Sequence, residues 1–142
     1  MKKLIRWILF IIAILYWINS SLSISIIDSL WTDKQIDWDE YVECVSSDNP
    51  ARNTLNLENF NKKYNNVIIS AIVKSYGSFE DCVHVTIDTK YSDLNVYVWL
   101  DLEDIAKLDI GDKITVNGKF KAYDNSISIG RSSNHAKLLK IN

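Results

Sequence analysis

The stretch Leu108–Asn125, LDIGDKITVNGKFKAYDN, combines a tight Gly-Asp turn with a strictly alternating strand. Its apolar residues occupy every second position, and Gly118 takes one of these inward positions. The other inward residues are Ile114, Val116, Phe120 and Ala122. A glycine inside a strand usually marks a bend or a bulge. The stretch therefore predicts a long strand that bends or bulges at Gly118 and serves two sides of a small closed barrel.

The chain on either side of this stretch predicts further strands, because apolar residues again recur at every second position. The inward sets are Val67, Ile69, Ala71 and Val73, then Val83, Val85 and Ile87, and then Val96, Val98 and Leu100. Asp124-Asn125 predicts a hairpin turn, Ser126–Gly130 the returning strand, and Ala136–Ile141 a short edge strand.

Two short helices complete the predicted elements. The first covers residues 54–64, with its apolar side chains at helical spacing. The second covers Asp101–Leu108, with Asp101 as the N-cap and Asp104 in the acidic position of a loose capping box. We expect Leu102, Ile105, Ala106 and Leu108 of this second helix to cover one end of the barrel.

The order of these elements is strand, strand, strand, short helix, long bent strand, strand, which is the order of the OB-fold. We therefore expect a mainly β protein: a five-stranded Greek-key OB-fold barrel with a short helix between strands 3 and 4. A short helix precedes the barrel, and a membrane helix precedes both.

Two parts of the chain, NKKYNNVIISAIVKS and VYVWLDLEDIAKLDIGDKITVNGKFKAYDNSISI, resemble the bacterial tRNA-anti-like OB-fold family. The resemblance covers roughly residues 53–141 and includes the run from Gly111 to Lys121, although Ala122 replaces a glycine that is common there. A cysteine found near the end of some members is also missing. The resemblance implies a small exported or membrane-attached protein. Because the family's motif is structural, it implies a fold and no particular chemistry.

The N-terminus predicts export. Lys2, Lys3 and Arg6 precede the apolar run from Trp7 to Ile18, and cations before an apolar run stay on the cytoplasmic side. One interpretation is an uncleaved anchor over residues 1–27, which makes a single-pass protein of the cytoplasmic membrane with its C-terminal domain outside. Another is a cleaved signal and a secreted or periplasmic domain, because small residues near Ser21 and Ser23 suit a peptidase. A buried core helix is the third.

Three segments follow from these patterns: the anchor or signal over residues 1–27, an acidic juxtamembrane segment over 28–52, and the OB-fold domain with its leading helix over 53–142. The stretch SSDNPARN, residues 46–53, is the boundary signal. The acidic segment carries interleaved aromatic residues, including Trp31, Trp38 and Tyr41. It is either a stalk, an amphipathic helix packed on the domain, or a partner-binding segment.

Candidate ligand-binding residues lie on the outer face of the predicted second and third strands, where OB-folds bind their ligands. They are His84, Thr86, Tyr97 and Trp99, and the nearby cations are Lys74, Lys90, Lys119 and Lys121. Exposed aromatic side chains on this face stack single-stranded nucleic acid in some proteins. The alternatives are that a helix covers Tyr97 and Trp99 as core residues, or that the face binds a protein or peptide.

Composition restricts the function. The 142 residues are 47% hydrophobic and 24% charged, with a net charge of −2, which disfavours a dedicated nucleic-acid binder. The two cysteines, Cys44 and Cys82, either form a disulfide or remain two buried thiols. His84 and His135 stand apart, so we expect no metal site, and no motif indicates an enzyme or a cofactor.

These observations together predict a non-enzymatic, membrane-tethered OB-fold domain outside the cytoplasm that engages a protein or peptide partner in the cell envelope. The alternative is binding of a single-stranded oligonucleotide through His84, Tyr97, Trp99 and the neighbouring lysines. A salt titration with oligonucleotides separates the two hypotheses, because phosphate contacts make nucleic-acid binding strongly salt-dependent.

Overall fold

The computed structural model describes residues 35–87 and 90–142, which belong to a compact unit spanning Asp33–Asn142. Its elements are α2 (Trp38–Cys44), α3 (Pro50–Lys63), β1 (Asn66–Tyr76), β2 (Cys82–Ile87), β3 (Val96–Trp99), α4 (Leu102–Ile105), β4 (Lys113–Ala122), β5 (Ile127–Ile129) and β6 (Lys137–Ile141). The anchor predicted over residues 1–27 lies outside the described residues. Within the described residues, every helix is too short or too polar to cross a membrane.

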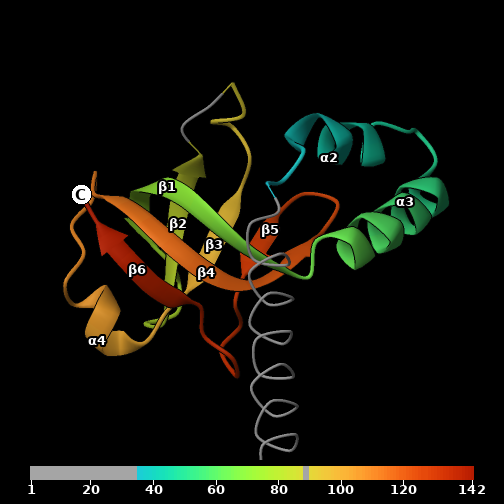
Figure 1. Cartoon of the computed structure of the whole chain (residues 1–142). Coiled ribbons are helices and arrows are strands. Elements are labelled where there is room, and N and C mark those ends of the chain that lie inside the picture. Colours follow the sequence, from blue (N-terminus) through green and yellow to red (C-terminus); the bar gives the residue numbers. More distant parts are fainter. Residues whose placement is uncertain (1–34, 88–89) are drawn as a thin grey trace, which may run out of the picture. The chain divides into compact units, whose positions relative to one another are not determined.

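Five strands close into a mixed β-barrel (Figure 1). β1 pairs with β2 and β2 with β3, in both cases antiparallel. β3 then pairs with β5 in parallel, β5 pairs with β4, and β4 returns to β1. β6 extends the sheet along β4. The strand count and the helix between β3 and β4 are as the sequence predicts, so this part of the fold is confirmed.

The inward-facing residues of the strands form the core, as their alternation predicts. Every apolar residue that the alternation assigns to the inside is at most 8% exposed, and Val67, Ala71, Val83, Val96 and Leu100 are fully buried. Burial of one large apolar side chain stabilises a fold by about 1.5–3 kcal/mol. The alternating strands therefore supply most of the barrel's hydrophobic stabilisation.

Gly118 meets a steric demand in the middle of β4. This strand pairs with β1 as far as Lys119 and with β5 from Phe120 onward, so it serves two sides of the barrel. The register with β1 is regular across Gly118, so of the two predicted alternatives, a bend or a bulge, the bulge is not formed there. A Cβ atom at residue 118 would lie 2.6 Å from the Cβ of Ala136 and 3.0 Å from Ile129. Glycine is required because the segment before β6 approaches so closely.

α3 begins at Pro50 instead of residue 54. The side chain of Asn49 accepts hydrogen bonds from the backbone N–H groups of Ala51 and Arg52, and Pro50 lies in the first turn. Both features favour a helix start. The stretch 46–53 contains the turn between α2 and α3 and lies inside the compact unit Asp33–Asn142.

α2 and α3 pack at the end of the barrel where β4 finishes (Figure 1). Tyr41 of α2 is 2% exposed and contacts Phe60 of α3, with ring centroids 6.0 Å apart. Phe60 in turn contacts Phe120 of β4 at 5.9 Å. The Tyr41 hydroxyl donates to the carbonyl oxygen of Tyr123 at 2.8 Å, and burial raises the pKa of Tyr41 to about 12.

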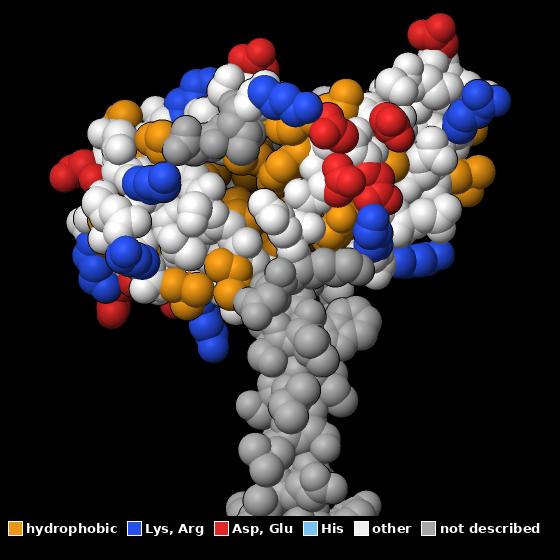
Figure 2. Space-filling view, turned by 45° about the horizontal axis from the view of Figure 1, so that its top comes forward, with side chains coloured by type: hydrophobic (Ala, Val, Ile, Leu, Met, Phe, Trp, Pro, Cys, Tyr) orange, Lys and Arg blue, Asp and Glu red, His pale blue; other side chains and the backbone are white. Residues whose placement is uncertain are grey.

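The acidic segment thus contains a helix packed on the barrel, over Trp38–Cys44. Of the three interpretations of this segment, the structure supports the amphipathic helix for these residues. The acidic side chains of α2 remain on the surface, where Figure 2 shows a group of them together. Trp31 lies outside the described residues.

α4 covers the other end of β4 less completely than predicted. Leu108 is buried and Ile105 packs against the core, but Leu102 is 56% exposed. Ala106 is also exposed. The prediction that all four residues cover the barrel end is therefore wrong for Leu102 and Ala106. With only four residues, the helix presents one narrow face to the barrel, and Leu102 lies off that face.

Candidate functional site: an aromatic pocket on the outer barrel face

Four strands bring one row of side chains together on the outer face of the barrel. His84 of β2 pairs with Tyr97 of β3, Tyr97 pairs with Ser128 of β5, and Ser128 pairs with Lys121 of β4. Directly paired residues of neighbouring strands point to the same face of a sheet. The row therefore runs from an imidazole through a phenol and a hydroxyl to an ammonium group, and three of its members are predicted site residues.

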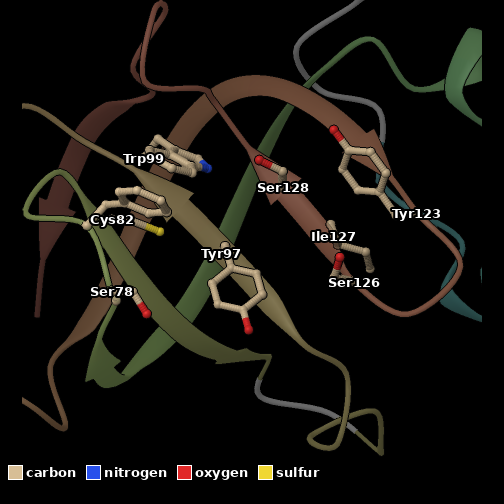
Figure 3. A pocket seen from close by; sticks show the side chains of 10 residues that line it. Ser78, Cys82, Tyr97, Trp99, Tyr123, Ser126, Ile127 and Ser128 are labelled. Carbon is tan, nitrogen blue, oxygen red and sulfur yellow. The ribbon is translucent and has the colours of Figure 1, made fainter.

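A pocket of about 380 Å³ opens on this face. It is lined by Gly77, Ser78, Phe79, Cys82, Tyr97, Trp99, Tyr123, Ser126, Ile127 and Ser128. Figure 3 shows Tyr97 and Trp99 on β3 and Tyr123 on the far side of β5, with Ser126 and Ser128 between them. In the described part of the chain, the lining contains aromatic rings and small hydroxyl groups and no charged side chain. Tyr97 and Trp99 are half-buried and remain open to this pocket, so α2 and α3 do not bury them as core residues.

Two aromatic residues of the pocket come from connections between strands. Phe79, in the turn between β1 and β2, is 64% exposed, and its ring centroid lies 5.6 Å from that of Trp99. Tyr123, in the turn after β4, is 46% exposed. Strand alternation predicts neither residue, because it carries no information on where the side chain of a turn residue lies. The sequence feature that could have indicated them is an aromatic residue in a short turn between two strands.

His84 stacks on Tyr97, with ring centroids 4.9 Å apart and planes at 20°. Partial burial, and to a smaller extent the positive charge of Lys74, lowers the pKa of His84 below its ordinary value. Its ring is therefore mostly neutral near pH 7. A neutral imidazole stacked on a phenol makes a flat, uncharged platform beside the pocket.

The remaining predicted site residues lie in different places. Thr86 is half-buried on β2 beyond His84 and outside the pocket lining. Lys119 and Lys121 line a second pocket, on the α3 side of β4. Lys90 forms an ion pair with Asp39 of α2 at 3.0 Å, so it is occupied away from the aromatic pocket.

Cys44 and Cys82 are both free thiols in this structure. Cys82 is buried beneath the turn that carries Phe79, and burial, followed by the nearby Asp81 carboxylate, raises the pKa of its thiol to about 11. Cys44 is on α2 and lines a separate pocket with Glu40 and Lys63. The predicted disulfide is thus not formed here, and the alternative of two buried thiols holds for Cys82 alone, because Cys44 is only partly buried.

His135 is not isolated, contrary to the prediction. Its Nδ1 lies 2.6 Å from the carboxylate of Asp101, and its Nε2 lies 3.0 Å from that of Asp81. The two carboxylates raise the pKa of His135. Asp101 is the N-cap residue of α4, as predicted, but its side chain forms no capping hydrogen bond. Its carboxylate contacts His135 instead, and His135 links the start of α4 to Asp81 in the turn before β2.

The chemistry that this face offers is binding by shape, stacking and neutral hydrogen bonds. Among the residues that the structure describes, no group of three or more His, Cys, Asp or Glu side chains is arranged to hold a metal ion. No protein-family model matches this chain, and neither does any curated protein.

Proposed function

We propose that this protein is a membrane-tethered OB-fold domain outside the cytoplasm that binds an extended segment of a protein partner in its aromatic pocket. The barrel order β1-β2-β3-β5-β4, closed by β1–β4, supports the OB-fold and the resemblance to the tRNA-anti-like family. The cations and apolar run of residues 2–18 support the tether and the placement.

One observation carries the peptide ligand: the pocket has four aromatic side chains, and none of the described residues that line it is charged. Pockets of this composition bind apolar groups and fix their orientation through a few hydroxyl or backbone groups. Ser126 and Ser128 supply such groups, and Phe79, Tyr97 and Trp99 supply rigid stacking surface. Aromatic residues with few rotatable bonds are typical of protein-binding surfaces.

Single-stranded nucleic acid is the second candidate, and the row from His84 to Lys121 favours it. A stacked imidazole and phenol beside a lysine resemble the platforms on which nucleic-acid bases stack. Each stacked base contributes about 1–3 kcal/mol of binding free energy. The uncharged pocket lining and the net charge of −2 oppose it, because phosphate neutralisation supplies much of nucleic-acid affinity.

A displayed library of random linear peptides, selected on the full-length chain in lipid nanodiscs, tests the proposal. Selected peptides are then measured by fluorescence polarisation against the unmodified chain and against Phe79→Ser. Ile110→Ser is the matched control, because Ile110 is 63% exposed, close to the 64% of Phe79, and lies outside the pocket. We expect Phe79→Ser to weaken binding at least tenfold and Ile110→Ser to leave it unchanged.

Two results would contradict the proposal. One is a selection in which no peptide is enriched, or in which enriched peptides bind Phe79→Ser as well as the unmodified chain. The other is tight, salt-sensitive binding of a fluorescent twelve-nucleotide DNA that competes with the peptides, which would establish the second candidate.

A further inference from the structure

A second pocket, of about 290 Å³, lies beside α3 and the end of β4. It is lined by Glu58, Asn61, Lys62, Asn65, Lys119, Phe120, Lys121 and Arg131. Four of these side chains are cations and one is a carboxylate. The chain as a whole carries a net charge of −2, so this pocket reverses the sign of the molecule locally.

Among the residues that the structure describes, none of the four cations is in an ion pair, and Glu58 is the one carboxylate of the lining. Within residues 35–87 and 90–142, the ion pairs of lysine include those of Lys63 with Glu40, Lys90 with Asp39 and Lys107 with Asp104. Lys62, Lys119, Lys121 and Arg131 form no ion pair among these residues. Like charges held close together repel one another, and an anion between them relieves that repulsion. The pocket is therefore arranged to accept a negatively charged group.

This basic pocket adjoins the aromatic pocket. Lys121 pairs with Ser128 across β4 and β5, and Ser128 lines the aromatic pocket. Tyr123, two residues after Lys121, lines the same aromatic pocket. Tyr97 and Lys121 thus flank Ser128 on either side, and an extended chain lying across β5 passes from the phenol ring to the lysine over two strand spacings, about 10 Å.

Backbone contacts hold the basic pocket in shape. The side chain of Asn61 donates to the Ala122 carbonyl at 2.9 Å and accepts from the Ala122 N–H at 2.7 Å, which fixes α3 and Lys62 beside β4. Gly130 donates to the Lys119 carbonyl at 2.8 Å, and Arg131 pairs with Asn134 through two backbone hydrogen bonds. The cations thus stem from a fixed backbone, and preorganisation of this kind lowers the entropic cost of binding.

We infer that the basic pocket is a carboxylate subsite, and that the partner segment carries Asp or Glu residues next to an apolar anchor. This inference rests on the proposed function and names the class of its ligand. A peptide places charge at chosen positions, so its apolar anchor fills the uncharged aromatic pocket while its carboxylates reach Lys119 and Lys121. A nucleic acid carries a phosphate at every nucleotide, including those that would lie along the uncharged lining.

The test uses the selected peptides and two synthetic probes, an acidic peptide Ac-EEWEE-amide and its neutral counterpart Ac-QQWQQ-amide. The variant is Lys119→Gln with Lys121→Gln. The matched control is Lys137→Gln with Lys140→Gln, which removes the same charge from exposed residues of β6. We expect enrichment of Asp and Glu beside aromatic residues, at least tenfold tighter binding of the acidic probe, and loss of that preference only in the Lys119/Lys121 variant.

Charge reversal sharpens the result. In Lys119→Glu with Lys121→Glu, the acidic probe should lose at least tenfold in affinity, and a Lys-containing probe, Ac-KKWKK-amide, should gain. Both substitutions lie on the outer side of β4, and circular dichroism with thermal melting verifies that each variant is folded.

Failure of this inference is distinguishable from failure of the proposed function. If selected peptides depend on Phe79 but contain no acidic residues and bind the Lys119/Lys121 variant normally, the carboxylate subsite is refuted and the peptide pocket stands. If the affinity of the acidic probe depends on Lys119 and Lys121 but not on Phe79, the carboxylate subsite is supported and the aromatic peptide pocket is refuted. If a twelve-nucleotide DNA displaces the acidic probe at equal concentration and physiological salt, the carboxylate assignment is overturned.

Discussion

The side-chain amide of Asn61 forms two hydrogen bonds with the backbone of Ala122, one to its carbonyl and one from its N–H. β1 pairs with β4 only as far as Lys119, so this amide continues the pairing of β4 beyond the end of β1. The side chain of this α3 residue thereby forms the hydrogen bonds that a neighbouring strand would otherwise form, and it joins α3 to the barrel.

Asn61→Ala should destabilise the folded chain by about 1–3 kcal/mol, because it removes both hydrogen bonds and leaves part-buried backbone groups of Ala122 without their partner. Asn59→Ala, at an exposed position of the same helix, gains the same helix propensity and is the control. Urea unfolding followed by circular dichroism measures both variants. Equal stability of the two would show that the amide contributes nothing.

Gly118→Ala should destabilise the barrel by about 1–3 kcal/mol through overpacking, because the new methyl group would meet the Cβ of Ala136 at 2.6 Å. Ala136→Gly removes that Cβ, so the double variant should recover part of the loss. The recovery stays incomplete because Ile129 also lies 3.0 Å away. A double-mutant cycle by thermal unfolding measures the coupling, and strict additivity would contradict the predicted contact.

The two histidines should make the stability of the chain depend on pH in opposite directions. The pKa of His135 is raised by Asp81 and Asp101, so its contribution is complete below the unfolded pKa near 6.5 and is lost as pH rises through the folded value. The pKa of His84 is lowered by burial and Lys74, so the unfolded state gains protons first and stability falls as pH drops below about 6.5.

The histidine contributions therefore reach their maximum near pH 6.5. Denaturant unfolding between pH 5 and 8 measures this profile, and each variant isolates one side of it. His135→Gln should flatten the decline above pH 6.5, and His84→Gln should flatten the decline below it. A decline above pH 6.5 that persists in His135→Gln would place its origin in another group.

Thiol chemistry should distinguish the two cysteines. With a pKa of about 11, only about one thousandth of Cys82 is thiolate at pH 8, and its burial slows modification further. Cys44 is partly exposed and should react first with a thiol reagent. The variants Cys44→Ser and Cys82→Ser identify each rate. Titration of the denatured, unreduced chain should find two thiols, whereas none would establish the Cys44–Cys82 disulfide.

Strand alternation carried enough information to predict the barrel, because inward residues such as Val83 and Val98 are buried purely by their position in the pleat. The same alternation placed Tyr97 and Trp99 on the outer face. It had no means to place Phe79 and Tyr123, which reach the pocket from turns, or to join His135 to Asp81 across 54 residues of sequence. Such contacts depend on how distant segments meet after the barrel has closed.

The start of α3 shows a different limit. Asn49-Pro50 predicts a helix start and a turn in a linker equally well, because Asn and Pro are common in both structures. Only the packing of Tyr41 against Phe60 decides between them, since it joins α2 and α3 into one folded layer. The local sequence is compatible with both structures, and the tertiary contacts determine that the helix α3 begins there.

The parallel contact between β3 and β5 involves only three residue pairs, yet the aromatic pocket lies directly over it. A ligand that contacts Trp99 on β3 and Ser128 on β5 spans one of the barrel's two shortest strand pairings, because β4 and β5 also pair over three residues. A bound ligand would stabilise the pairing of β3 with β5, because it can bind only while the two strands are paired. The backbone N–H of Ile127 donates to the Asn95 carbonyl where β3 and β5 pair, so its hydrogen exchange reports on this pairing. Exchange of this amide proton with solvent should slow when a ligand is bound.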